Sequence, residues 1–522
     1  MRTLKQSTLI IMAFSILTRI LSFIFKIYLS RKVGAEMLGL FQMSLSVFAL
    51  FCTISASGIP LILSRKTAAL TAHGQEGKVH GVFTGAALLS LGAAFLLIVG
   101  AVLLRDRIGV LFSDERCIRL FYIILPALFS TVLYQLIRGY LMGKKKYIEY
   151  SFTELLEELL RIVICVSFLS NAFLLLSKDV ALAIAFTVTD YAMLIVLLVL
   201  YFAKGGRIRK PDGVGEILRS GTPITLMRIA AGALSSFIAI ALPAALVKAG
   251  LTAGEAAAEY GRAVGMAFSL LFAPLSLTGA LCVVILPETA SLAAKGQWDE
   301  LRSRVDRSMT FIFLITVIFY AMYVVMGECY GELLFGDAKA GRFIAFSAGM
   351  VIPVALSGLI NTTLNSLGEE KKVFIAFAIS STVLIAEILL LPKYLGIYAL
   401  AVAESSFYLL QFIFGMIFLY KKKACGKTFF RPAVTIMLFA FPCIAVMKGA
   451  DAFVAGRVSL LFRTAFVSLL GGATYLLLLM ILRPIPSVKT ILFKFFPKKK
   501  GLRGVRALRP RQNNFIKKWK EQ

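Results

Sequence analysis

Long apolar stretches, separated by short charged or glycine-containing segments, recur along nearly the whole chain. A helix needs about 20 apolar residues to cross the hydrocarbon core of a bilayer, because it rises about 1.5 Å per residue. The pattern predicts fourteen such spans, at 8–29, 38–62, 80–104, 118–142, 153–177, 179–203, 217–247, 261–287, 308–328, 342–366, 373–392, 396–420, 429–448 and 460–483. We therefore predict an all-α, polytopic membrane protein.

Composition excludes a soluble globular protein. The 522 residues are 59% hydrophobic and only 16% charged, whereas about a quarter of the residues in a soluble domain are charged. The net charge of +29 would suggest a nucleic-acid partner in a soluble protein. Here the basic residues lie mostly in short loops and in the C-terminal tail, which is typical of topology control in a membrane protein. We expect no nucleic-acid partner.

The basic residues also predict the orientation of the chain. The loops on the side of the two termini hold more Lys and Arg than the opposite loops, so we expect both termini in the cytoplasm. The tail at 484–522 holds twelve Lys and Arg against a single acid, Glu521. We expect this tail to bind anionic headgroups of the cytoplasmic leaflet. The first apolar stretch contains Arg19 and Lys26, and we interpret it as a retained helix.

Two similar segments indicate an internal duplication. Residues 69–75 follow the second span and residues 291–297 follow the eighth, and the two segments share Leu, Ala, Gly and Gln at equivalent positions. A repeat six spans apart predicts two pseudo-symmetric six-helix lobes. The predicted domains are an N-terminal lobe at 1–203, a basic inter-lobe linker at 204–216, a C-terminal lobe at 217–420, two further helices within 421–483, and the basic cytoplasmic tail at 484–522.

Some basic residues lie inside the predicted spans. A Lys or Arg near the bilayer centre costs about 2.5–3.5 kcal/mol on insertion scales, so such residues usually face a cavity or a partner. Arg19 and Lys26 lie on one face of the first helix, although Lys26 can also snorkel to the interface. Arg228 lies about halfway along the seventh helix, and Arg262 lies at the mouth of the eighth. We interpret these four residues as candidate binding residues of a central cavity.

A second group of charges lies in the fourth and fifth predicted helices. Its members are Arg138, Glu154, Glu157, Glu158 and Arg161. The residues of the fifth helix lie three or four positions apart, which places them on neighbouring turns. Two interpretations stay open. The group is either an internal ion-pair network that offsets the cost of burying charge, or a gate between moving lobes that responds to a proton or an ion.

Catalytic and cofactor-binding patterns are missing from the sequence. It contains no H-E-x-x-H, no G-x-S-x-G and no nucleotide-binding loop, and the glycine-rich linker lacks a Gly-Lys-Ser/Thr ending. The seven cysteines are scattered, and the two histidines have no partner at metal-ligand spacing. We therefore expect neither an enzyme nor a metal or cofactor site.

Several short runs resemble the stage V sporulation protein B group, in the polysaccharide flippase branch of the multidrug/oligosaccharidyl-lipid/polysaccharide (MOP) exporter superfamily. These runs are Gly34–Gln42, Ser57–Pro60, Ser64–Lys66, Arg138–Gly143, Tyr260–Gly261, Gly265–Met266 and Leu286–Pro287. Glu157 and Arg161 also fall where the group has a Glu and an Arg. Met142 departs from the group, which has Gln at this position. The resemblance extends over essentially the whole membrane domain.

The resemblance implies a multi-pass protein of the bacterial cytoplasmic membrane. Its two lobes would enclose a V-shaped cavity with alternating access, and the protein would flip a lipid-linked (polyprenyl pyrophosphate) saccharide or peptidoglycan precursor in envelope or spore-cortex biogenesis. The cavity residues Arg19, Lys26 and Arg228 would hold the anionic pyrophosphate. A coupling ion, H⁺ or Na⁺, or the membrane potential would supply energy.

Three alternatives remain. A multidrug/cation antiporter of the same superfamily would need acidic residues in its cavity, whereas the first helix offers Arg19 and Lys26 and the second offers no acid. A non-transporting membrane scaffold for envelope assembly would tolerate loss of these cations. An integral membrane glycosyltransferase would need larger loops than this chain has.

Overall fold

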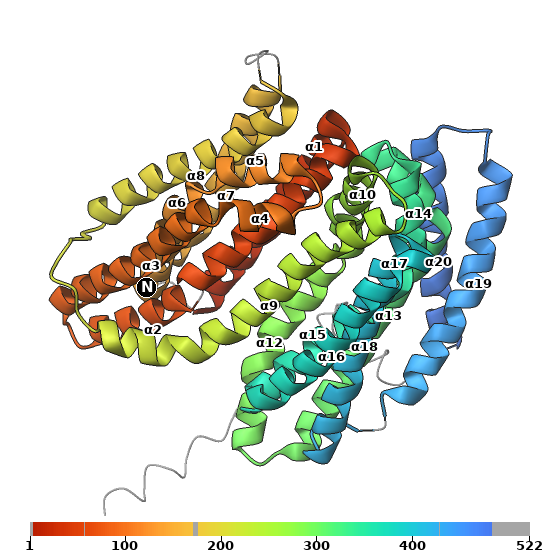
Figure 1. Ribbon diagram of the computed structural model, residues 1–522. Coiled ribbons are helices and arrows are strands. Elements are labelled where there is room, and N and C mark those ends of the chain that lie inside the picture. Colours follow the sequence, from red (N-terminus) through yellow and green to blue (C-terminus); the bar gives the residue numbers. More distant parts are fainter. Residues whose placement is uncertain (1–3, 57, 171–175, 427, 483–522) are drawn as a thin grey trace, which may run out of the picture.

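The computed structural model describes residues 4–56, 58–170, 176–426 and 428–482, and these residues form helices joined by short loops, without strands (Figure 1). The first part comprises α1 (Leu4–Ala56), α2 (Ile59–Ala72), α3 (Glu76–Leu103), α4 (Arg105–Leu111), α5 (Glu115–Ile124), α6 (Ala127–Gly143), α7 (Tyr147–Leu169), α8 (Lys178–Ala203) and α9 (Val214–Lys248). The second part comprises α10 (Ala253–Tyr260), η1 (Gly261–Ala267), α11 (Phe268–Leu271), α12 (Leu275–Ala294), α13 (Trp298–Tyr330), η2 (Gly331–Phe335), α14 (Ala338–Ser347), η3 (Ala348–Met350), α15 (Val351–Ser366), α16 (Glu370–Leu390), α17 (Pro392–Leu395), α18 (Tyr398–Lys421), α19 (Phe430–Val454) and α20 (Leu460–Leu482).

The predicted all-α membrane fold is confirmed, and each of the fourteen predicted ranges overlaps at least one helix of the described residues. Ten helical stretches of the described chain are long and apolar enough to cross a membrane, or eleven if the bent pair α5–α6 is one span. The number is smaller than fourteen for physical reasons. The first two predicted spans form one stretch, α7 carries many charges, and the predicted span 261–287 is divided among η1, α11 and α12.

Gly34 interrupts α1 where the sequence predicts a loop between two spans. Its backbone has φ 82° and ψ 172°, a conformation that glycine adopts without the steric cost that a side chain would add. The two halves of α1 therefore follow one another without a connecting loop. We call the end of the molecule that carries Gly34 the kink end, and the end that carries residues 204–213 the linker end.

Two lobes lie side by side and meet near α1 and α10 (Figure 1). Helices α1–α8 form the first lobe and α10–α18 the second, while α9 contacts both. The buried apolar side chains explain this shape. One continuous core joins both lobes at the kink end, whereas the linker end has two separate cores, one among α2, α3, α6 and α8 and the other among α12, α13, α15 and α18. The lobes therefore share a core at the kink end only.

The last two helices form an appendage on the second lobe. Helices α19 and α20 pack against each other and against α13, and a fourth apolar core lies between them. Figure 1 shows this pair at the edge of the molecule, far from α1–α8. The predicted basic tail at 484–522 lies outside the described residues.

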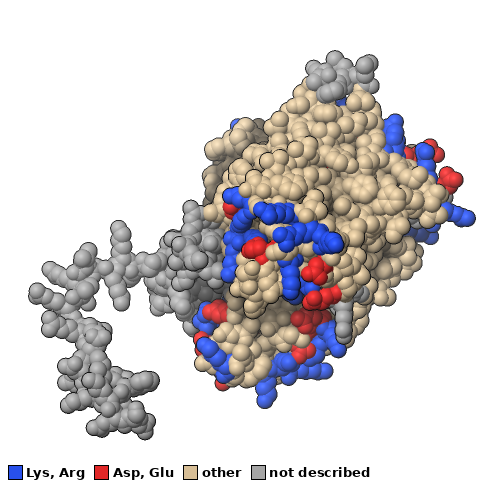
Figure 2. All heavy atoms as spheres, turned by 90° about the vertical axis from the view of Figure 1, so that its left-hand side faces the viewer, with Lys and Arg blue, Asp and Glu red and all other residues tan. Residues whose placement is uncertain are grey.

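Basic side chains gather at the linker end. Figure 2 views the molecule from this side and shows Lys and Arg crowded around the middle of the face, with fewer acidic residues among them. Exposed members of this group on the first lobe are Arg65, Lys78, Lys145, Lys204, Arg207, Arg209 and Lys210. Above this group, the same view shows a broad area of uncharged side chains, as expected for a surface that faces lipid (Figure 2).

Candidate functional site

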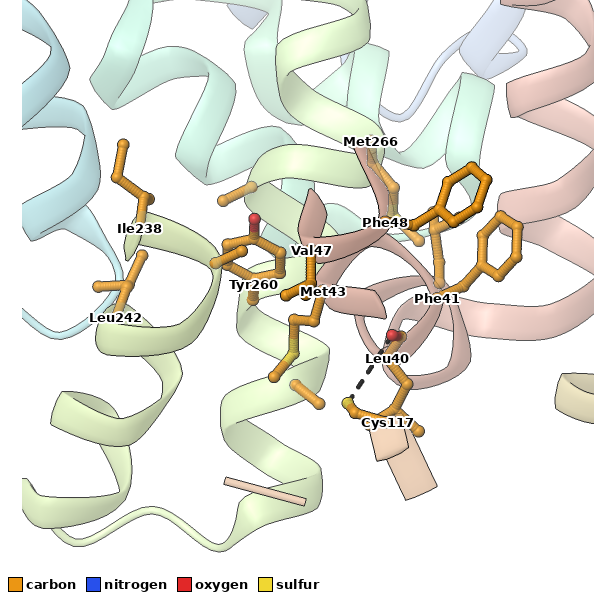
Figure 3. Packing of buried hydrophobic residues seen from close by; sticks show 14 of the residues in the cluster. Leu40, Phe41, Met43, Val47, Phe48, Cys117, Ile238, Leu242, Tyr260 and Met266 are labelled. Carbon is orange, nitrogen blue, oxygen red and sulfur yellow. Dashed lines mark hydrogen bonds between the residues drawn. The ribbon is translucent and has the colours of Figure 1, made fainter. Parts of the chain in front are cut away.

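The junction between the lobes at the kink end is the first candidate site. Met43 of α1 lies beside Tyr260 of α10, and Leu40 of α1 lies beside Cys117 of α5 (Figure 3). These residues and Leu242 of α9 belong to one apolar core and are almost completely buried. The thiol of Cys117 in α5 donates a hydrogen bond to the Leu40 carbonyl oxygen at 3.7 Å, which ties this part of α1 to the rest of the first lobe. The junction is therefore a buried, apolar contact between helices of both lobes.

Two glycines allow the helices of this junction to touch through their backbones. A Cβ at Gly39 would lie 1.9 Å from the carbonyl oxygen of Ala257, and a Cβ at Gly261 would lie 2.0 Å from the carbonyl oxygen of Ala35. These distances are far below van der Waals contact. Only glycine is compatible with this approach of α1 to α10 and η1.

Arg31 of α1 forms hydrogen bonds that cross between the lobes. The Arg31 Nε of α1 donates to the carbonyl oxygen of Leu334 at 2.8 Å, and an Arg31 Nη donates to the carbonyl oxygen of Leu333. Both carbonyls belong to η2. A guanidinium presents several donors in one plane, which suits two neighbouring carbonyl oxygens. Arg31 therefore adds a polar link to the apolar junction.

Arg262, predicted as a cavity residue, lies at this end and makes two ion pairs within the second lobe. Its guanidinium donates to Glu259 at 2.8 Å and to Asp337 at 2.7 Å. Burial alone would raise the pKa of Asp337, but the hydrogen bonds from Arg262 and from the Ala340 amide hold that pKa below its usual range. Asp337 also caps the start of α14 by accepting from Ala340, so this pair fixes a loop to two helices.

The second candidate site is the charge group of the first lobe. Arg138 of α6 donates to Glu157 of α7 at 2.7 Å. Arg161 donates to Glu157 as well, and to Glu158 at 3.1 Å. Glu157 and Glu158 are only 9% and 6% exposed. A buried carboxylate between two guanidiniums is well compensated in charge and in hydrogen bonds. The structure thus brings together four of the five predicted residues as an ion-pair network.

Two predicted residues lie beside this network. Glu154 accepts a hydrogen bond from the Tyr150 hydroxyl at 2.9 Å instead of pairing with an arginine. Lys26 of α1 is half-buried and interacts electrostatically with Glu158. The ring of Tyr134 lies 5.1 Å from the Arg138 guanidinium, in the geometry of a cation–π contact. The network therefore extends from α6 and α7 toward α1.

The predicted cavity cations Arg19 and Arg228 lie outside both sites. Arg19 is exposed on the first half of α1, and Arg228 is exposed on α9. In the part of the chain that the structure describes, neither Arg19 nor Lys26 forms an ion pair. Since α9 contacts both lobes, Arg228 lies on the element that connects them. A role of these residues in binding substrate stays a prediction.

Sequence reasoning missed the parts of the junction that carry no charge pattern. Gly39 and Gly261 lie in runs that resemble the related group, but the sequence does not show that they face each other. Arg31 was not singled out, because its acceptors are backbone carbonyls. Asp190 of α8 is 1% exposed and accepts a hydrogen bond from the Thr131 hydroxyl at 2.6 Å. Unlike the junction residues, this pair is indicated by the sequence, because a lone acid within an apolar span is a candidate for pairing between helices.

A metal site is not formed by the residues that the structure describes. They contain no cluster of three or more His, Cys, Asp or Glu side chains able to hold a metal ion. All seven cysteines are unpaired thiols, and most are buried. The carboxylates of Glu157 and Asp337 are paired with arginines, whereas the buried Nε atoms of Arg138 and Arg161 have no hydrogen-bond partner among the described residues.

The fold and the two sites define a class of membrane transporter, built from two helical lobes that share a contact at one end. A family model described as "Lipid II flippase MurJ" matches residues 72–471. The chain therefore belongs to this family. Its members are transporters, which confirms the expectation that the protein is not an enzyme.

Individual relatives agree with this assignment. The chain is 23% identical to stage V sporulation protein B of Bacillus subtilis (strain 168) over 383 residues, which cover 70% of this chain and 73% of the relative. It is 24% identical to sporulation protein YkvU of the same organism over 301 residues, or 55% of this chain and 66% of that protein. The resemblance to the stage V sporulation protein B group is confirmed.

Solved structures show the same fold. A lipid II flippase MurJ in an inward closed conformation matches with a TM-score of 0.72 and 12% identity, covering 94% of this chain and 99% of that chain. An inward-facing multidrug resistance MATE family transporter of the MOP superfamily matches with a TM-score of 0.66 and 14% identity, covering 78% and 94%. These likenesses show that the chain has the fold of the two transporters.

Proposed function

We propose that the protein moves a lipid-linked saccharide or peptidoglycan precursor across the bacterial cytoplasmic membrane, in envelope or spore-cortex biogenesis. The polar headgroup would pass between the lobes while the polyprenyl tail stays in lipid. No covalent bond needs to change. The task is to lower the cost of carrying sugars and a pyrophosphate through hydrocarbon, and lobes that open alternately to either side perform it.

The arrangement of the apolar cores carries this proposal. The lobes share one core at the kink end and have separate cores at the linker end. Such a molecule can admit a headgroup from the linker end while the kink end stays closed. The junction of Gly39, Gly261 and Arg31 would then be the contact that breaks when the protein opens to the other side.

The cluster of basic residues at the linker end supports a cytoplasmic position for that end (Figure 2), because Lys and Arg are enriched in cytoplasmic loops. In this orientation both termini lie in the cytoplasm. The proposed substrate would thus enter from the cytoplasmic leaflet and leave at the kink end. A proton or sodium gradient or the membrane potential would drive the cycle.

The exposed cations Arg19 and Arg228, together with the half-buried Lys26, are proposed to hold the pyrophosphate. Each lies on α1 or α9. Since α1 takes part in the junction at the kink end and α9 contacts both lobes, an anion held by both helices would sense their relative position. Attraction between a pyrophosphate and such cations is stronger in a poorly solvated cavity than in water.

Reconstitution tests the proposal. Purified protein in liposomes receives a fluorescent lipid-linked pyrophosphoryl saccharide, and a membrane-impermeant quencher reports how much of it reaches the far leaflet. We expect transfer by the wild type, and at least a tenfold slower transfer by Arg19→Ala. Arg107→Ala is the matched control, because Arg107 is an exposed arginine of α4 at the kink end.

Two results would contradict the proposal. Absence of transfer by the wild type with several pyrophosphoryl saccharides, together with export of cationic dyes, would favour the drug antiporter. Equal slowing of transfer by Arg19→Ala and Arg107→Ala would remove Arg19 from the pathway.

A further inference from the structure

The linker between the lobes is fixed to one helix of the first lobe. The Asp212 amide donates to the carbonyl oxygen of Gly81 in α3 at 3.1 Å. The Arg209 amide donates to the Thr84 hydroxyl at 3.3 Å. The His80 ring lies one turn before Thr84 in α3 and accepts a hydrogen bond from the Arg207 amide. Successive backbone groups of the linker thus find partners on α3, so the linker is a strap with a defined position.

Three glycines on α3 make room for this strap. A Cβ at Gly81 would lie 3.0 Å from the carbonyl oxygen of Lys210, and a Cβ at Gly85 would lie 2.8 Å from that of Asp212. At Gly77 the nearest atom is a guanidinium nitrogen of Arg209, at 2.6 Å. The linker backbone and the Arg209 side chain therefore rest directly on the helix.

The strapped face of α3 continues as a face exposed to lipid. Leu88 lies seven residues after Gly81, and Phe95 lies seven residues further, so all three share one side of the helix. Leu88 and Phe95 are 61% and 57% exposed. In a membrane-spanning helix such apolar side chains contact acyl chains. The strap thus covers the end of this face, at the depth of the headgroups.

A basic pocket of about 480 Å³ lies between the strap and α3. Lys78, Arg209 and Lys210 line it, with Asp212 as the one acidic residue of the lining. Within the described residues, none of these three cations forms an ion pair. Neighbouring lysines differ, because Lys66 pairs with Glu216 of α9 and Lys144 pairs with Glu76. The pocket therefore has uncompensated positive charge next to a surface for acyl chains.

We propose that this pocket binds the phosphate of an anionic glycerophospholipid, with the acyl chains along Leu88 and Phe95. A free phosphate would use the cations but not the apolar face, and a zwitterionic lipid would bring its own cation into a basic pocket. Headgroup binding would fasten the strap to α3 and hold the start of α9 at the first lobe. The site does not depend on the transported substrate.

Native mass spectrometry of the purified full chain tests this site. Dioleoyl-phosphatidylglycerol and dioleoyl-phosphatidylcholine are added separately, and the bound fractions are compared. We expect a clear preference for phosphatidylglycerol. A basic residue at an anionic surface contributes about fivefold to affinity, so Arg209→Ala combined with Lys210→Ala should weaken phosphatidylglycerol binding by roughly 30-fold. Lys371→Ala combined with Lys421→Ala is the matched control, since both are exposed lysines of the second lobe outside the pocket.

Three outcomes would overturn the proposal. The first is equal binding of the two lipids by the wild type, and the second is equal weakening in both double variants. The third is displacement of phosphatidylglycerol by millimolar inorganic phosphate or by stoichiometric polyprenyl pyrophosphate, which would assign the pocket to those ligands. Charge reversal in Lys78→Glu provides a second variant, with an expected loss larger than that of a single alanine substitution. Gel filtration establishes that each variant is folded.

Discussion

Adding one methyl group at Gly39 should force the lobes apart at the kink end. A Cβ there would lie 1.9 Å from the Ala257 carbonyl oxygen, and non-bonded atoms rest at about 3.5 Å, so α1 and α10 must separate by roughly 1.5 Å. Overpacking of this kind costs about 1–3 kcal/mol. A change of that size shifts a two-state equilibrium by roughly 5- to 150-fold. The state closed at the kink end should lose population by this factor in Gly39→Ala.

Spin-label distances measure this shift. Labels at Arg107→Cys and Lys339→Cys would report the separation of the lobes, because both positions are exposed at the kink end, one on each lobe. The half-buried Cys52 and Cys282 are replaced by alanine first, so that only the introduced thiols react. Gly39→Ala should move the distance distribution toward longer values, and Gly261→Ala should do the same.

Gly92→Ala is the control for a glycine substitution in a helix. A Cβ at Gly92 of α3 would meet no heavy atom within 4 Å, so the distances should stay as in the wild type. The reasoning is refuted if folded Gly39→Ala protein gives the wild-type distance distribution. It is also refuted if Gly92→Ala and Gly39→Ala change the distances equally.

Two further predictions concern charges. Glu157→Gln leaves two half-buried guanidiniums without their shared carboxylate, so the free energy of unfolding should fall by about 3–5 kcal/mol, seen as a lower Tm. Glu154→Gln is the control and should change Tm little, because its amide oxygen can still accept from Tyr150. Equal losses of Tm in the two variants would contradict the network. Asp337 has a lowered pKa, so the stability from its pair with Arg262 is complete above the usual carboxyl pKa near 4 and disappears as pH falls through the lowered value. In Asp337→Asn, the decrease of Tm with falling pH below about pH 4 should become smaller. A pH profile of Tm equal to that of the wild type would refute this role.

The helices could be predicted from the sequence because bilayer thickness imposes a minimum apolar length. Each of the fourteen ranges overlaps a helix of the described residues for this reason. The internal breaks could not be predicted in this way. The predicted span 261–287 is divided at Pro274, where α11 ends and α12 begins, and hydropathy is the same on both sides of such a break. The exact domain boundaries stay predictions.

In the candidate sites, too, some contacts could be predicted from the sequence and others could not. Spacing alone predicts that Arg161 can reach Glu157 and Glu158, because residues three or four apart are neighbours on a helix. Arg138 joins them only because α6 packs beside α7. Arg31 bonds to carbonyls about 300 residues away, and a backbone acceptor has no signature in the sequence. Local pairs are thus predictable, and contacts between distant elements are not.

The placement of charge explains how the kink end can open at low cost. Among the described residues, every ion pair at this end joins residues of one lobe, including Arg116 with Glu36 and Arg262 with Asp337. Breaking a buried ion pair costs about 3–5 kcal/mol, because it leaves a charge uncompensated. The contacts between the lobes include close glycine contacts, apolar contacts and the hydrogen bonds of Arg31. The ion pairs therefore stabilise each lobe internally, and the lobes can separate without breaking an ion pair.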